Sequence, residues 1–231
     1  SPPSRWPCML ASGKSIRQND ITEGACKPFH CVVLVLLRQV GEGHMDIRGV
    51  FQYSKIIAAT DTDHLSEALR SRACAVLLMH ARITELLTED FQEKVRQKPL
   101  FLHADLVKGL SGDKEAFVFL SKYVRPLGIF TTKSAMIRAA KKEGLLTVQR
   151  VFLIDTASFH TSIKTIQENE PDAIEIMPGI APSVIKMYKE FIRQPIIVGG
   201  LISSARHVND ALNAGADAVS LSKSELWNLQ R

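Results

Sequence analysis

From Ser54 onward, short apolar runs alternate with amphipathic stretches, and this alternation restricts the fold more than any other feature of the sequence. Apolar runs of this length are typical of strands that are buried on both faces of a parallel sheet. The runs are Lys55–Thr60, Cys74–His80, Pro99–Leu106, Gly128–Thr132, Leu145–Ile154, Ala173–Pro178, Pro195–Ile202 and Ala218–Ser222. The stretches between them predict amphipathic helices over Asp63–Ser71, Ile83–Gln97, Lys114–Val124, Ser134–Glu143, Ala157–Asn169, Ala181–Arg193 and Ser204–Ala214.

Strands that alternate with helices in this way predict an α/β protein, a single-domain (β/α)8 barrel of the TIM-barrel type. Residues that commonly end helices lie at the predicted boundaries, because Gly215 lies where a helix is expected to end and Pro195 follows another helix. The alternative is an open, doubly wound sheet. That fold carries a glycine-rich turn after its first strand, whereas residues 58–61 (Ala-Ala-Thr-Asp) contain no glycine. The sequence therefore favours the barrel.

The first 44 residues lack this periodicity and mix Pro, Ser, Gly and Cys without an amphipathic pattern. The tripeptide Gly43-His44-Met45 is typical of a cloning scar or a misassigned start, so Met45 is a candidate initiator. We therefore expect residues 1–44 to be a non-native or disordered extension and residues 45–231 to form the domain. With 231 residues, 45% of them hydrophobic, the chain can fill one core of barrel size.

Composition restricts the compartment and the partners only weakly. A net charge of +5, carried by scattered Lys and Arg, permits a polyanionic partner without requiring one. The four cysteines form no CxxC pair, and Cys74 enters an apolar run where an inert buried thiol is expected. The longest apolar run, residues 32–37, is far shorter than a membrane span. We expect a cytoplasmic protein with no membrane partner.

Signatures of metal and nucleotide sites are missing from the sequence. Its seven histidines show neither HxxxH nor HxH spacing. No Walker loop, GxGxxG or GxSxG motif is present. We therefore expect no metal site and no cofactor.

The seventh apolar run contains a pair of glycines, and a Ser-Lys pair lies at the end of the eighth. The seventh run leads into Gly199-Gly200, and the eighth ends at Ser222-Lys223. Glycine lets the backbone approach a ligand closely, and loop N–H groups at one sheet edge can bind a phosphate. In (β/α)8 barrels a phosphate commonly lies at the loops after the last two strands. The sequence therefore predicts a phosphorylated small molecule as the ligand.

Polar residues also lie near the C-terminal ends of the middle strands, where a barrel carries its chemistry. Alternation places His103 and Asp105 on the same, interior side of the third strand, either as a structural pair or as ligand contacts. Arg150 lies in an apolar run and requires an anion, which could be Asp105, Glu175 or a ligand phosphate. Glu175 is expected to point into the barrel, where it could balance Arg150 or bind polyol hydroxyls. A tight loop at Gly179 opens the end of that strand.

A run of cations marks the fourth predicted helix. A solvated helix face is the usual role of such a run, and it is also a surface that RNA phosphates could contact. The candidate RNA-binding residues are Lys133, Arg138, Lys141 and Lys142.

In their order along the chain, these motifs resemble the glycerol uptake operon antiterminator family. The resemblance covers roughly residues 54–229 and rests on Phe101–Leu110, Gln149–Asp155, Glu175–Gly179, Gly199–Ile202 and Ser222–Trp227. It implies a barrel domain that senses glycerol 3-phosphate and then acts on the leader of its target messenger RNA, preventing early transcription termination. It also implies a regulator rather than an enzyme, with glycerol 3-phosphate as effector.

The resemblance also implies a site. Carried over by position, the phosphate would lie against Gly199, Gly200, Leu201 and Ser222, with Lys223 nearby. The glycerol end, next to the loop at Gly179, would face His103, Asp105, Gln149, Arg150 and Glu175.

A phosphate-binding barrel enzyme of the isomerase or lyase type is the alternative, with Asp105 or Glu175 as general base. No lysine lies in the middle of the later strands, which removes the Schiff-base class. The residues alone leave acid–base chemistry open, and the resemblance decides for the regulator. The sequence leaves the RNA-binding face and a homo-oligomeric state open.

Overall fold

The computed structural model of the protein describes residues 46–230. Eight parallel strands close into a barrel in the spatial order β1-β9-β8-β7-β6-β5-β3-β2, and β2 pairs back onto β1. An additional short strand, β4, pairs with the end of β2. The predicted (β/α)8 barrel is thereby confirmed. The strands are β1 (Ile56–Asp61), β2 (Ala75–Arg82), β3 (Leu100–His103), β4 (Val107–Lys108), β5 (Gly128–Thr131), β6 (Leu146–Phe152), β7 (Ala173–Met177), β8 (Ile196–Gly199) and β9 (Ala218–Leu221).

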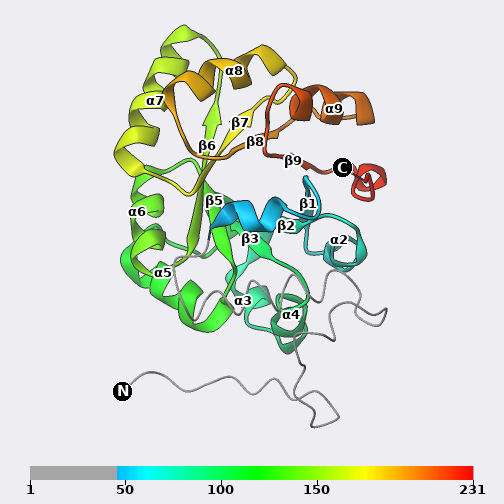
Figure 1. Ribbon diagram of the computed structural model, residues 1–231. Helices are drawn as coiled ribbons and strands as arrows, with labels where there is room; N and C mark the ends of the chain where they lie inside the picture. Colours follow the sequence, from blue (N-terminus) through cyan, green and yellow to red (C-terminus); the bar gives the residue numbers. More distant parts are fainter. Residues whose placement is uncertain (1–45, 231) are drawn as a thin grey trace, which may run out of the picture.

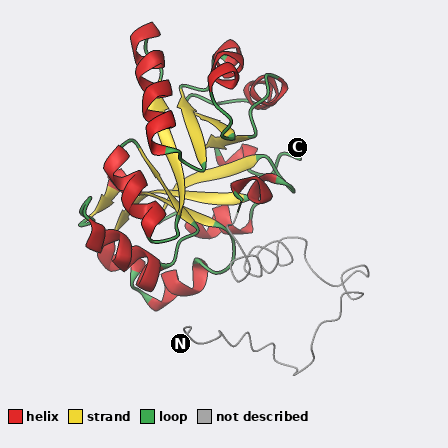
Figure 2. Cartoon of the chain, turned by 60° about the vertical axis from the view of Figure 1, so that its left-hand side comes forward, coloured by secondary structure: helices red, strands yellow, loops and turns green. Residues whose placement is uncertain are grey.

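Helices surround the strands (Figures 1 and 2). Shorter helical turns join them: the 3-10 helices η2 (Ile47–Phe51), η3 (Ala104–Leu106) and η5 (Ser224–Leu226), and the π-helix η4 (Leu120–Val124). The α-helices are α2 (Leu65–Arg70), α3 (Ile83–Leu86), α4 (Glu89–Lys94), α5 (Lys114–Phe119), α6 (Ser134–Lys142), α7 (Thr156–Asn169), α8 (Pro182–Phe191) and α9 (Ala205–Asn213).

Alternation along each strand builds two apolar layers. One set of side chains, including Leu77, Phe101 and Phe130, fills the inside of the barrel. The other set, including Leu78 and Leu102, packs between the strands and the surrounding helices. Because both faces of every strand are covered, the strands read as continuous apolar runs in the sequence.

A short helix closes the N-terminal end of the barrel. Ile47, Val50 and Phe51 of η2 are buried and join the cluster of side chains inside the barrel. In Figure 1, η2 (blue) lies across the strands at the centre of the view. The domain boundary at Met45 stays a prediction, and the predicted extension, residues 1–44, lies outside the described residues.

Several predicted segments differ from the structure in their bounds. The strand expected over Pro195–Ile202 ends at Gly199, and the helix expected over Lys114–Val124 is completed by the π-helix η4. The third strand was expected to run to Leu106, but it ends at His103, and η3 follows directly. The predicted helix over 83–97 divides into α3 and α4, because Thr88 caps the start of α4 by accepting a hydrogen bond from the amide of Phe91 at 3.3 Å. Among the helices of residues 46–230, none combines the length and the apolar character that crossing a membrane requires.

Candidate functional site

The centre of the barrel holds a buried ionic cluster, Arg150, Glu175 and Ser220, which we call the central cluster. Arg150 and Glu175 are direct neighbours on β6 and β7, and Arg150 Nε donates to Glu175 Oε2 at 2.5 Å. Ser220 of β9 donates its hydroxyl to the other oxygen, Glu175 Oε1. Glu175 therefore supplies the anion that Arg150 requires, and the fully buried carboxylate is bonded at both oxygens.

His103 lies at the end of β3 and is 3% exposed. Burial, reinforced by the positive charge of Arg150, lowers the pKa of His103 to about 4. The imidazole is therefore neutral near pH 7. Within the described residues, its Nδ1 is buried without a hydrogen-bond partner. A buried polar atom without a partner is costly, so this position can accommodate a water or a polar ligand group.

Asp105 does not share the interior with His103, because the strand has already turned into η3 at Ala104. Its partners are Thr131, whose hydroxyl donates at 2.6 Å, and Thr132, whose amide and hydroxyl donate at 2.8 Å and 2.9 Å. Burial opposes ionisation of Asp105, but these hydrogen bonds outweigh it and lower its pKa. Asp105 is therefore held as a carboxylate by threonines, in place of the expected pairing with His103 or contact with a ligand.

Gln149 lies on the opposite side of β6 from Arg150. It contacts α7, donating to Thr165 Oγ1 at 3.0 Å and accepting from Asn169 Nδ2 at 2.9 Å. Successive residues of a strand point to opposite faces, so Gln149 and Arg150 cannot both face the inside of the barrel. The structure thus separates Gln149 from the other expected ligand contacts.

The loop after β8 has an unusual backbone. Gly200 and Leu201 both have positive φ, 75° and 60°. Gly179 fixes this loop to the end of β7, because its amide donates to the carbonyls of Gly199 at 2.6 Å and Gly200 at 3.1 Å. A Cβ on Gly199 would lie 2.5 Å from both Glu175 Oε1 and Ser220 Oγ, so the central cluster itself requires glycine there.

The neighbouring ends of β8 and β9 carry polar groups that are open to solvent. Since Gly199 pairs with Ser220, Leu201 and Ser222 follow at adjacent strand ends. Among the loop and turn hydrogen bonds of the described residues, none has the backbone amide of Leu201 or Ser222 as its donor. We call Gly199–Leu201 together with Ser222 and Lys223 the glycine rim. The ammonium of Lys223 lies beside it, donating to the carbonyl of Ser203 at 3.2 Å. The rim therefore has donors that could bind an anion.

A cavity of about 380 Å³ adjoins the glycine rim through Ser222. Asp61 and His64 meet on its wall, Oδ1 to Nδ1, at 2.9 Å, and this hydrogen bond raises the pKa of His64. Except for Ser222, the lining residues were not expected from the sequence. The usable signal was that Asp61 and His80 lie at strand ends. The lining residues are Ala59, Thr60, Asp61, His64, Glu67, Met79, His80, Ser222, Ser224 and Trp227.

Two cations of the expected RNA-binding helix are occupied elsewhere. Arg138 donates to Asn169 Oδ1 at 3.1 Å, and Lys141 donates to the carbonyls of Asn169 and Glu170 at 3.3 Å and 2.5 Å. These contacts cap the C-terminus of α7, where cations and donors are favourable. Lys133 and Lys142 are exposed. The basic helix thus contributes to docking α6 on α7.

The protein is a closed β/α barrel, a class in which a phosphate commonly lies at the loops after the last two strands. A family model described as "Glycerol-3-phosphate responsive antiterminator" matches residues 55–227. The chain belongs to the glycerol-3-phosphate responsive antiterminator family. This is a family of regulators, whose fold is shared with enzymes.

Relatives of known structure agree with this membership. The structure is similar to the glycerol uptake operon antiterminator regulatory protein of Listeria monocytogenes, with a TM-score of 0.70 and 32% identity over 75% of this chain and 94% of that one. It is also similar to a glycerol uptake operon antiterminator-related protein of Thermotoga maritima, with a TM-score of 0.66 and 29% identity over 76% of this chain and 99% of that one.

Two further proteins are similar, an uncharacterized relative and an enzyme that shares the fold. YgcP of Escherichia coli strain K12, an uncharacterized protein, is 32% identical over 81% of this chain and 98% of its own. The N-acetylmannosamine-6-phosphate 2-epimerase of Clostridium perfringens shares the fold alone, with a TM-score of 0.57 and 12% identity over 78% of this chain and 90% of that one.

Proposed function

We propose that this protein is a transcription antiterminator that senses glycerol 3-phosphate at the glycine rim and binds the leader of its target messenger RNA. The observation that carries the proposal is the pair of backbone amides at Leu201 and Ser222, neither of which donates a loop or turn hydrogen bond among the described residues. Family membership points to glycerol 3-phosphate as the effector. Because leader transcripts are made in the cytoplasm, the protein acts there.

The phosphate binds the amides of the rim, the hydroxyl of Ser222 and the ammonium of Lys223. Gly200 and Leu201 both have positive φ, so the loop turns sharply at these two residues. A dianion is suited to several N–H donors and one cation without needing a buried counter-charge. The glycerol end extends toward the cavity, where Asp61 and His80 offer hydrogen-bonding groups for hydroxyls.

Direct contact of the glycerol end with Arg150 and Glu175 is not part of this proposal. Both side chains are buried and bonded to each other, and Ser220 occupies the second carboxylate oxygen. His103 supplies the remaining interior group, since its Nδ1 has no partner among residues 46–230. The same facts disfavour the enzyme alternative. Asp105 is a weak base because its pKa is lowered, and Glu175 is covered.

A thermal-shift experiment tests the ligand. Glycerol 3-phosphate at about 100 times its Kd should add roughly 2.7 kcal/mol to the free energy of unfolding and raise Tm. Glycerol should leave Tm unchanged, because the phosphate supplies most of the binding. Lys223→Met should weaken the shift, whereas Lys108→Met, a matched loss of an exposed lysine outside the rim, should preserve it. Equal shifts from both ligands, or none from either, would refute the assignment.

A further inference from the structure

Exposed arginines gather at the N-terminal end of the barrel. Arg72 precedes β2, Arg96 precedes β3 and Arg125 precedes β5, each in the connection from the preceding helix. These three strands are neighbours in the barrel, so the arginines follow one another along its edge. Arg193 occupies the equivalent connection before β8, and Arg48 of η2 donates to its carbonyl at 2.9 Å. We call these five residues the arginine end.

Few acids offset this charge. In the described part of this end, the exposed acids are Asp46, which lies 3.9 Å from Arg48, and Glu170. Asp172, Asp217 and Glu143 are half-buried, and the two aspartates accept hydrogen bonds from backbone amides at the starts of strands. Their charges are therefore partly used within the fold, and the arginine end carries a net positive charge.

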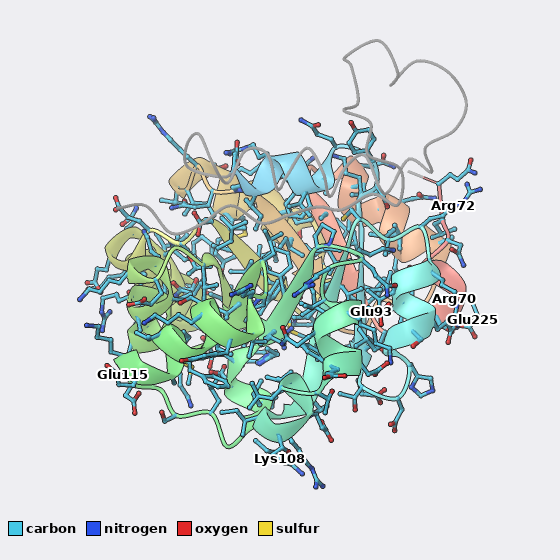
Figure 3. The ribbon with its side chains drawn as sticks, turned by 90° about the horizontal axis from the view of Figure 1, so that it is seen from below. Arg70, Arg72, Glu93, Lys108, Glu115 and Glu225 are labelled. Carbon is cyan, nitrogen blue, oxygen red and sulfur yellow. The ribbon has the colours of Figure 1, made fainter. Side chains whose placement is uncertain are left out.

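The opposite end of the barrel, where the strands end and which we call the mouth, carries a different set of exposed charges. Figure 3 shows Arg72 on the side of the molecule where η2 lies and Lys108 at the opposite side. At that opposite end, the strand-to-helix connections expose Asp63, Asp113 and Asp155 with Lys108, Lys133 and Lys223, and the exposed Arg82 lies 4.0 Å from Glu85. Among the connections of the described residues, exposed cations therefore outnumber exposed acids more strongly at the end away from the proposed ligand.

The residue type at the arginine end is informative as well as its sign. A guanidinium binds a phosphate with two parallel hydrogen bonds and is less strongly hydrated than an ammonium, which favours it for phosphate recognition. Five exposed arginines define this end, with Lys141 of α6 reaching Glu170 beside them, and the opposite end carries Arg82 as well as Lys108, Lys133 and Lys223. A row of arginines on neighbouring connections is suited to a partner with repeated phosphates.

We propose that the arginine end binds the phosphodiester backbone of RNA. The inference rests on the proposed antiterminator function and assigns its RNA to the face opposite the glycerol 3-phosphate site, in place of the basic helix α6. Charge complementarity argues for a nucleic acid here, since phosphate contacts supply most of the non-specific affinity of such complexes. Arg138 and Lys141 of α6 instead stabilise the end of α7.

Charge reversal at the two ends tests the assignment. The variant Arg72→Glu/Arg96→Glu is compared with Lys108→Glu/Lys133→Glu, which changes the net charge equally at the mouth. The probe is a labelled RNA hairpin with a GC-rich stem and a uridine tail, titrated with and without glycerol 3-phosphate at two KCl concentrations. The arginine variant should bind at least about tenfold more weakly, with a salt slope reduced by roughly 2, while the lysine variant stays within about threefold of wild type.

Folding is checked in the same samples. Both variants should keep the Tm shift caused by glycerol 3-phosphate, and the milder Arg72→Gln/Arg96→Gln should reproduce a weaker form of the same RNA defect. An equal loss of RNA affinity in both charge-reversal variants, or a loss confined to the lysine variant, would refute RNA binding at the arginine end. The proposed antiterminator function would remain intact. Ligand-induced stabilisation without any RNA binding by the wild-type protein would reject the RNA part of the proposed function, and the arginine end with it.

Discussion

The central cluster and the glycine rim use the same kinds of groups in opposite states. In the central cluster, Arg150, Glu175 and Ser220 are buried and bonded to one another. At the rim, a few residues further along the chain, Ser222 is exposed, and the amides of Leu201 and Ser222 donate no loop or turn hydrogen bond among the described residues. Groups that already satisfy each other stabilise a fold, whereas unsatisfied donors are available to a ligand.

Gly199 connects the two regions. It ends β8, begins the rim, and lies so close to Glu175 and Ser220 that a Cβ there would overlap both. The position of the rim therefore depends on the central cluster beneath it. This difference leads to a clear expectation: changes at the centre should affect stability first, and changes at the rim should affect ligand binding first.

The largest effect is expected from breaking the buried ion pair. Arg150→Met leaves the carboxylate of Glu175 buried without its cation, and we expect the free energy of unfolding to fall by about 3–5 kcal/mol. Urea denaturation followed by circular dichroism measures it. The double variant Arg150→Met/Glu175→Leu should recover most of the loss, because it removes both charges together. If Arg150→Met is as stable as wild type, the central cluster tolerates an unpaired carboxylate. The expected difference between the central cluster and the glycine rim would then not hold.

A smaller effect is expected from acidification. His103 binds a proton with a pKa of about 4 in the folded protein, against 6.5 in its ordinary state. Between these values the unfolded chain binds more protons, so stability rises with pH across the window and is lost as pH falls from 6.5 toward 4. We expect a loss of about 2–3 kcal/mol attributable to this residue.

His103→Gln isolates that contribution, since glutamine does not titrate. The difference in unfolding free energy between wild type and variant should shrink by the same amount from neutral pH to pH of about 4, measured by urea denaturation at several pH values. A difference that stays constant with pH would show that the imidazole titrates normally and is more open to solvent than the central cluster beside it.

Much of the fold could be predicted from the sequence. The inside of a barrel and the layer beneath its helices both require apolar side chains, so each strand becomes an apolar run that is easily recognised. The end of β3 could not be predicted, because Ala104-Asp105-Leu106 continues the alternation of the strand although it forms η3. The contribution of η2 was missed for a related reason: its three buried residues span one turn, too short for a periodic signal.

The site was predicted less completely, for reasons that can be named. An arginine within an apolar run requires an anion, and Glu175 was one of three candidates that only the strand register could separate. Gln149 was placed with Arg150 by motif, although neighbouring strand residues face opposite sides. The roles of Arg138 and Lys141 depend on the carbonyls that end α7, and a one-dimensional pattern of charge contains no information on such contacts.

The smallest effect gives the sharpest test, because it compares two serines on one segment. Ser220 is buried and donates to Glu175, whereas Ser222 is exposed at the rim, two residues later. Ser220→Ala should lower the free energy of unfolding by roughly 1–3 kcal/mol, because it takes a hydrogen bond from a buried carboxylate. Ser222→Ala should leave stability unchanged and weaken glycerol 3-phosphate binding about fivefold, the value of one lost hydrogen bond of roughly 1 kcal/mol. Isothermal titration calorimetry and urea denaturation on both variants separate the outcomes. If Ser222→Ala binds the ligand as tightly as wild type does, the phosphate does not contact the hydroxyl at the end of β9, and the donors of the rim reduce to its amides and Lys223.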